Sequence, residues 1–142
     1  YFLLKTNKLN KTNLSTYLYS NKMDLNELIG FCIGDGNIYY NKRYRVYRLE
    51  LVGNIEEDYD YFQKINKFLI KITKKRCRVK IRRESKGNSL RIQFNNKGFV
   101  DRLISIGLPA GKKTYTIKIP ERLTERKSMI SIIKGIFEAD GC

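Results

Sequence analysis

Two segments of the chain end in the same dipeptide, Asp-Gly, and their acids are the side chains best suited to chemistry. The segments are residues 28–36 (LIGFCIGDG) and residues 133–141 (IKGIFEADG). Each carries two small residues four positions apart, namely Gly30 and Gly34 in the first and Gly135 and Ala139 in the second. Small residues at this spacing lie on one face of a helix and allow two helix backbones to approach closely. The match predicts a helix pair that brings Asp35 and Asp140 to the same end.

An aspartate at the carboxyl end of a helix is repelled, because that end carries about half a negative charge. Two such ends side by side increase the repulsion between Asp35 and Asp140. Divalent cations bound by the carboxylates, by main-chain oxygens and by phosphate oxygens would remove this repulsion. A lone Asp-Gly is more simply a turn that ends a helix, but two matched copies favour the metal site.

Histidine is absent from the chain, so His-ligated metal sites, zinc fingers and Ser–His or Cys–His catalysis are excluded. Any active site must therefore use carboxylates, Lys, Arg and metal ions. The three cysteines, Cys32, Cys77 and Cys142, match no paired spacing, and scattered thiols are typical of a reducing, intracellular setting. The bias towards Lys, Asn, Ile and Tyr indicates an A+T-rich genome, and organelles are one such setting.

The net charge indicates the class of partner. The 142 residues hold 29 Lys and Arg against 14 Asp and Glu, which gives a charge of +15 and a pI near 9.8. Such an excess suits a polyanion, because each phosphate neutralised by Lys or Arg releases counterions. A solvated basic surface and a ribosomal or membrane-surface protein are the alternatives. We expect no membrane span, since no apolar run approaches the roughly 20 residues that cross a bilayer.

The residue pattern also predicts the elements that position the two acids. Asp24 caps a helix, with Glu27 as its capping-box partner, and Asn54 caps a second helix over 55–71. Alternating apolar and polar residues predict strands, and these cover 37–41, 44–52, 75–83 and 89–94. A short helix over 97–106 and a last helix after Pro120 complete an α+β fold with an antiparallel sheet.

The sheet is the part expected to contact the polyanion. In residues 75–83 the apolar side chains alternate with four cations, so the cations share one face, and that face includes no acid. A curved antiparallel sheet can lay such a face in the major groove of DNA, where Arg reads guanine and Gln reads adenine. The candidate DNA-contacting residues are Arg76, Arg78, Lys80, Arg82, Arg91 and Gln93 from the second pair of strands, and Tyr39, Tyr44, Arg48 and Glu50 from the first. A solvated face without a partner usually mixes charges.

The two matched segments resemble the paired motifs of LAGLIDADG homing endonucleases, and GIFEADG is close to the motif that names the family. Residues 106–113 (IGLPAGKK) also resemble the segment that precedes the second motif in the archaeal-type, two-motif branch. The resemblance covers residues 24–142 and implies an αββαββα half domain, with a four-stranded saddle-shaped sheet and helices on one face, followed by the second motif helix. The chain then divides into a loose leader (1–22), a first half domain (23–127) and the second motif helix (128–142).

The activity that the resemblance implies is that of a site-specific DNA endonuclease, which hydrolyses phosphodiester bonds in double-stranded DNA. Asp35 and Asp140 match the motif acids that hold Mg²⁺ or another divalent cation, beside the main-chain oxygens of Gly34 and Ala139. A water positioned by the metal is the nucleophile expected of such a site. The first motif departs from the family at Ile33, where an acid is usual.

Two further roles follow from the same resemblance. Lys113 matches the basic residue that lies near the scissile phosphates, with the adjacent Lys112 as an alternative. Asn54 is the nearest candidate for the polar residue that the family places at the end of the second strand.

The sequence stops one residue after the second motif, whereas another sheet half follows that motif in two-motif family members. We expect this second half domain to come from missing C-terminal sequence or from another chain. Alone, the chain is expected to bind half of a DNA site weakly and to cut little. Two alternative functions stay open on this scaffold. One is an RNA-binding intron maturase, whose partner is intron RNA, and the other is a non-catalytic DNA-binding regulator, which would tend to lose the motif acids.

Overall fold

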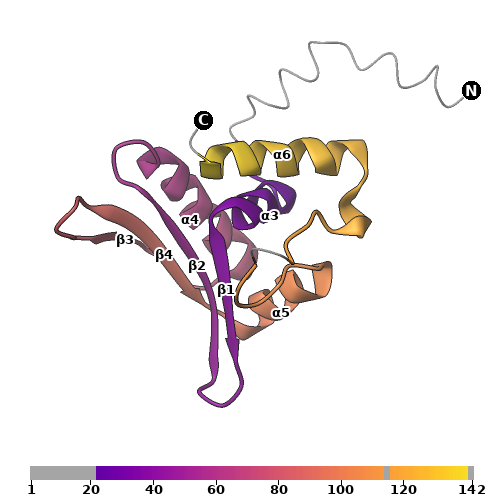
Figure 1. Cartoon of the computed structure of the whole chain (residues 1–142), viewed down its shortest axis with the longest axis horizontal. Coiled ribbons are helices and arrows are strands. Elements are labelled where there is room, and N and C mark those ends of the chain that lie inside the picture. The colour runs from indigo at the N-terminus through magenta and orange to yellow at the C-terminus, as the bar shows by residue number, and fades with distance from the viewer. Residues whose placement is uncertain (1–21, 114–115, 141–142) are drawn as a thin grey trace, which may run out of the picture.

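The helices and strands follow one another in the order that the sequence pattern predicts. The computed structural model describes residues 22–113 and 116–140, so the expected leader lies outside the described residues apart from Lys22. The elements labelled in Figure 1 are α3 (Leu25–Gly34), β1 (Gly36–Asn41), β2 (Val46–Asn54), α4 (Tyr59–Thr73), β3 (Val79–Arg82), β4 (Ser89–Asn95), α5 (Lys97–Ile106) and α6 (Arg126–Asp140), with a 3-10 turn at Glu121–Leu123. No helix within these ranges is both long and apolar enough to cross a membrane.

The four strands form one antiparallel sheet in the order β1-β2-β4-β3. Leu49 of β2 pairs with Ile38 of β1 on one side and with Phe94 of β4 on the other, and all three side chains are buried. Alternate residues of each strand point to the opposite face, which none of the described helices covers. Figure 1 shows α3, α4 and α5 gathered along the sheet and α6 lying alongside α3. The predicted α+β fold, with helices on one face of a four-stranded antiparallel sheet, is confirmed.

The apolar stripe of α4 fills the space between this helix and the sheet. Phe62, Ile65 and Leu69 recur at helical spacing and are fully buried. Burial of each such side chain contributes about 1.5–3 kcal/mol. Tyr61 is also buried, and its ring centroid lies 5.4 Å from that of Phe31 in α3. Tyr59, at the first turn of the helix, is 46% exposed.

The start of α3 bears out half of the predicted capping box. Asp24 is the N-cap residue, and its Oδ1 accepts a hydrogen bond of 2.8 Å from the amide of Glu27. The carboxylate of Glu27, expected to reach back to Asp24, has its partners on other helices. It accepts from Tyr61 Oη at 3.0 Å and pairs with Lys134 Nζ at 3.3 Å. Because Glu27 is buried between the helices, partners there are needed to offset the loss of water.

The second helix begins at Tyr59 and not at residue 55, so its predicted start and its cap by Asn54 were wrong. Asn54 ends β2, where its Oδ1 accepts from the amide of Glu56 at 2.8 Å. In turn, Oδ2 of Asp58 accepts from the amide of Asn54 at 2.6 Å. These bonds between side chains and backbone hold residues 54–58 in a turn and displace the first helical turn. The N-cap residue of α4 is Asp58.

The hairpin turn is longer than predicted. Asn41 pairs with Val46, so residues 42–45 form the turn and β2 begins at Val46 and not at residue 44. Arg45 adopts a left-handed backbone with φ of 52°, which a tight reversal of the chain requires. Tyr44 therefore lies in the turn, where it is 68% exposed, and not on the sheet.

The strand predicted over 75–83 is confined to Val79–Arg82. The chain leaves α4 through Lys74, which has a left-handed φ of 56°, and it pairs with β4 only from Val79 onwards. Arg76 and Arg78 consequently precede the strand. Cys77 is buried as the alternation predicts, but Ile81, on the edge strand, is 53% exposed.

Among the described glycines, the closest approach of two backbones joins α3 to α6. A Cβ atom added at Gly30 would lie 2.0 Å from the carbonyl oxygen of Ile132, and one added at Gly135 would lie 2.0 Å from that of Glu27. The sequence separation between Gly30 and Gly135 equals that between Glu27 and Ile132. Exchanging the two helices therefore exchanges the two contacts, so an approximate twofold axis relates them. Gly30 faces Ile132, and Gly34, one turn further along α3, faces Ala139, further along α6. The contacts therefore advance in the same direction along both helices, and α3 and α6 lie parallel.

This packing predicts that Gly30→Ala and Gly135→Ala destabilise the fold, since each methyl group must push two backbones apart. We expect each change to lower the free energy of unfolding by about 1–3 kcal/mol, as measured by urea denaturation. Gly98→Ala on α5 is the matched control, because the nearest atom to its added Cβ is 3.6 Å away. Alanine there is expected to be neutral or stabilising by up to about 1 kcal/mol. Equal effects at all three glycines would contradict the close approach of α3 and α6.

Candidate functional site

The carboxyl ends of α3 and α6 meet at one end of the helix pair. Asp35 is the C-cap residue of α3, and Asp140 is the last residue of α6. A Cβ atom added at Gly34 would lie 2.5 Å from Cβ of Ala139 and 3.6 Å from Oδ1 of Asp140. The carboxylate of Asp140 therefore lies beside the last turn of α3, next to Asp35. The structure thus brings together the two acids that the sequence singled out.

The two acids influence each other electrostatically. Burial raises the pKa of Asp35 above its ordinary value of 3.8, and the negative charges of Asp140 and Asp58 raise it further. The ammonium group of Lys113 partly opposes this rise. The charged form of Asp35 is therefore disfavoured where it stands, and an added positive charge between the carboxylates would stabilise it.

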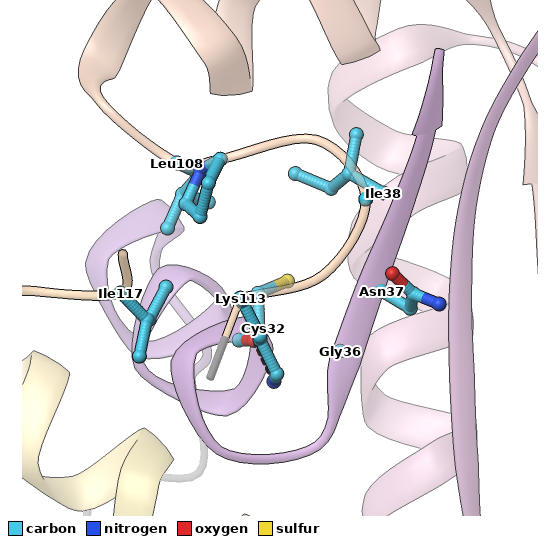
Figure 2. Close-up of a pocket in the computed structure, with 9 residues that line it drawn as sticks. Cys32, Gly36, Asn37, Ile38, Leu108, Lys113 and Ile117 are labelled. Atoms are coloured by element: carbon cyan, nitrogen blue, oxygen red, sulfur yellow. Dashed lines mark hydrogen bonds between the residues drawn. The ribbon is translucent and has the colours of Figure 1, made fainter. Parts of the chain in front are cut away.

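Lys113 provides one positive charge at this end of α3. Its Nζ donates to the carbonyl oxygens of Cys32 at 2.9 Å, Ile33 at 3.0 Å and Gly34 at 2.5 Å. Figure 2 shows Lys113 beside Cys32, where the loop that follows Leu108 reaches the end of the helix. The three bonds satisfy carbonyls that have no partner within the helix, and the charge complements the helix dipole.

Burial changes the pKa values of both Lys113 and the neighbouring Cys32. Burial lowers the pKa of Lys113, while Cys32, Asp35 and Asp140 act in the opposite direction. Burial raises the pKa of the Cys32 thiol to about 12, which removes it as a nucleophile at neutral pH. The cavity beside Lys113 measures about 10 Å³, room for at most one water. This cavity is therefore too small to hold a substrate.

The available metal ligands are all oxygens. Within residues 22–113 and 116–140, no group of three or more His, Cys, Asp or Glu side chains is placed to hold a metal ion. Main-chain oxygens can add to the two carboxylates, and among these the oxygen of Gly34 already accepts from Lys113. Such a sparse set of hard oxygen ligands suits Mg²⁺, which usually binds through one or two carboxylates together with water and substrate phosphates. The residues present fit this cation.

The open face of the sheet carries most of the predicted DNA-contacting residues. The strand register aligns them in rows across the sheet, and these rows are Tyr39–Arg48–Asn95, Asn37–Glu50–Gln93, Val52–Arg91–Lys80 and Asn54–Ser89–Arg82. Seven of the ten predicted residues lie in these rows. Tyr44, in the hairpin turn, and Arg76 and Arg78, before β3, do not.

Polar contacts link the central residues of this face. Glu50 pairs with Arg48 at 3.6 Å and with Arg91 at 3.4 Å, and it accepts from Gln93 Nε2 at 3.1 Å. Nε of Arg48 donates to Oδ1 of Asn95 at 3.1 Å. Sequence reasoning missed Asn95, because the predicted strand ended at residue 94, and only the strand register places Asn95 opposite Arg48.

Comparison with solved structures finds a similar fold in variants of one homing endonuclease. No family model and no curated protein matches the sequence. Mesophilic variants of the homing endonuclease I-DmoI align with a TM-score of 0.50 at 21% identity, over 88% of this chain and 57% of theirs. The homing endonuclease I-WcaI, solved bound to its DNA recognition sequence, aligns with a TM-score of 0.48 at 17% identity, over 91% of this chain and 57% of its own. The chain thus has the fold of one part of I-DmoI and spans 57% of its length.

Proposed function

We propose that this chain is part of a site-specific DNA endonuclease, which hydrolyses the phosphodiester backbone with the help of a divalent cation. The observation that carries the proposal is the meeting of Asp35 and Asp140 at the joined ends of two parallel helices. The fold shared with the homing endonuclease I-DmoI and the resemblance of the two segments to LAGLIDADG motifs support it. The net charge of +15 suits the DNA backbone.

In this proposal Asp35 and Asp140, with the main-chain oxygens of Gly34 and Ala139, hold the cation. When bound, the cation would polarise the scissile phosphate and stabilise the leaving 3′ oxygen. Lys113 keeps a positive charge fixed within reach of the same phosphate through its bonds to α3. A charge fixed in advance stabilises a transition state more than one that must first reorient.

The exposed face of α6 supports a second half domain in the complete enzyme. Leu28 and Cys32 of α3 are buried towards the sheet, and the positions that match them on α6 are Ile133 and Phe137. These two side chains are 42% and 59% exposed. We propose that a second sheet half, from further sequence or from another chain, packs on them. Without it the chain would contact only half of a DNA site and cut little.

The first test of the function is cleavage by the chain once its second half domain is supplied. Asp35→Asn and Asp140→Asn are each expected to keep duplex affinity within about threefold and to abolish cleavage, a loss of at least about a hundredfold. Nicking of supercoiled plasmid DNA with Mg²⁺ measures cleavage, and fluorescence anisotropy measures affinity. Nicking at near wild-type rates by both variants would refute the assignment.

A second test uses thermal unfolding of the chain alone. In EDTA at neutral pH, Asp140→Asn is expected to raise stability on the order of 0.5 kcal/mol, because it removes a repelled charge at a helix end. The folded chain holds the proton of Asp35 more tightly than the unfolded chain does, since the pKa is raised above 3.8. Ionisation of Asp35 therefore costs stability as the pH rises through that raised pKa. The increase in stability that Asp140→Asn gives at neutral pH should therefore become smaller in acid.

Saturating Mg²⁺ should reverse the order of the two proteins in the same assay. The cation is expected to stabilise the wild type by roughly 1–3 kcal/mol and Asp140→Asn by much less. Asp101→Asn is the control, because Asp101 pairs with Lys97 on α5, away from the site. Equal Mg²⁺ shifts in the wild type, Asp140→Asn and Asp101→Asn would contradict a shared metal site.

A third test separates Lys113 from its neighbour Lys112. Lys113→Met removes three hydrogen bonds from a charged donor, so the free energy of unfolding should fall by about 1–3 kcal/mol. Lys112 is exposed, and Lys112→Met should change stability by less than about 0.5 kcal/mol. Chemical denaturation of the two variants measures the difference. A larger loss in Lys112→Met would show that the two lysines exchange roles.

A further inference from the structure

Glu50 lies in the middle of the open sheet face and is surrounded by hydrogen-bond donors. Its Oε1 faces Nη1 of Arg91 at 3.4 Å, and its Oε2 faces both Nη1 of Arg48 at 3.6 Å and Nε2 of Gln93 at 3.1 Å. Both oxygens are therefore engaged. The side chain is only 13% exposed, against 30% for Arg48 and 21% for Arg91.

The strand register fixes this arrangement. Arg48 and Glu50 are two residues apart on β2 and so point to the same face. Gln93 is the direct partner of Glu50 on β4, and Arg91 lies diagonally across from it. β2 and β4 are the two central strands, so the contacts do not depend on an edge of the sheet.

An acid at this place is unexpected on a face that binds a polyanion. Within the described sheet, Glu50 is the one acid among the strand residues of the open face. Its negative charge would oppose the approach of phosphates. With both oxygens engaged and little exposure, it is also poorly placed to accept a hydrogen bond from a cytosine amino group, the contact by which an acid would read a base.

Unlike Glu50, the two arginines still have groups that can contact a base. A guanidinium has five N–H donors, so Arg48 and Arg91 keep donors for a base edge after pairing with Glu50. Arg48 is further held by its bond to Asn95 and lies over the ring of Tyr39, 5.7 Å from its centroid. Arginine side chains fixed before binding lose less conformational freedom when they meet DNA. Fixed side chains also discriminate better between bases.

We propose that Glu50 is a positioning residue, which holds Arg48 and Arg91 in the orientations that read the DNA sequence and does not itself contact a base. This replaces the direct DNA contact that the sequence predicted for Glu50. The inference rests on the proposed function, since it requires that the open face binds DNA. Glu50 lowers the affinity for DNA in general and raises the preference for one sequence.

The test measures affinity and preference separately, with the full 142-residue chain. Wild type and Glu50→Gln are incubated with a pool of random-sequence DNA duplexes, and the duplexes that the wild type retains are sequenced. Fluorescence anisotropy then gives the affinity of each protein for the pool and for the best recovered duplex. We expect Glu50→Gln to bind the pool about threefold more tightly, because a negative charge is lost. Its preference for the best duplex should fall about tenfold.

The opposite signs of these two changes exclude a simple folding defect, which would weaken both affinities. Glu125→Gln is the control for charge, since Glu125 is exposed and lies just before α6, away from the sheet. Its preference should equal that of the wild type. If Glu50→Gln does not fold by circular dichroism, Glu50→Asp takes its place. This change keeps the charge but retracts it, so the preference should fall without a gain in pool affinity.

The outcomes separate the inference from the function on which it rests. If Glu50→Gln, or Glu50→Asp in its place, keeps the full sequence preference of the wild type, the inference is overturned. The proposed function is not affected by that result. A wild type that binds every duplex alike contradicts site-specific binding itself, and the inference fails with it. A weaker affinity of Glu50→Gln for the pool also overturns the inference, because Glu50 would then contribute to binding directly.

Discussion

The structure depends on the close approach of two helix backbones, α3 and α6, at Gly30 and Gly135. At each glycine the facing carbonyl leaves no space for a side chain. The approach fixes the helices parallel and in one register, so their carboxyl ends coincide. Around this contact the buried Glu27 is paired with Lys134 and Tyr61, which links both helices to α4. The packing of backbones thus determines where the acids stand.

The same packing places two carboxylates close together, so that they repel each other. Burial raises the pKa of Asp35, and the negative charge of Asp140 at the adjoining helix end raises it further. Lys113, from a loop remote in sequence, donates to the last carbonyls of α3. Its positive charge partly neutralises the negative charge at this end of the helix. In the proposed function a divalent cation binds these carboxylates and in turn binds a phosphate, and groups with perturbed pKa values are common at active sites. In the proposed function, the sheet face guides DNA to that point.

Sequence reasoning succeeded where the determinant is local. The helix over Lys97–Ile106 follows from its own residues, and the small residues before Asp35 and Asp140 repeat at helical spacing. It failed where the determinant is a distant partner. Lys113 bonds to α3, Glu27 to Tyr61 and Glu50 to Arg91, and each contact joins residues remote in sequence that no periodicity encodes. The late start of α4 was missed because side-chain bonds around Asn54 and Asp58 compete with the helix.

Crystallography of the chain with Mn²⁺, using anomalous scattering, tests most directly whether the paired helix ends form one metal site. A single strong anomalous peak is predicted between the carboxylates of Asp35 and Asp140, within the roughly 2.0–2.2 Å of each that oxygen ligands of such cations require. Peaks elsewhere on the surface with none between the two acids would contradict the account. So would a structure in which the carboxyl ends of α3 and α6 lie apart.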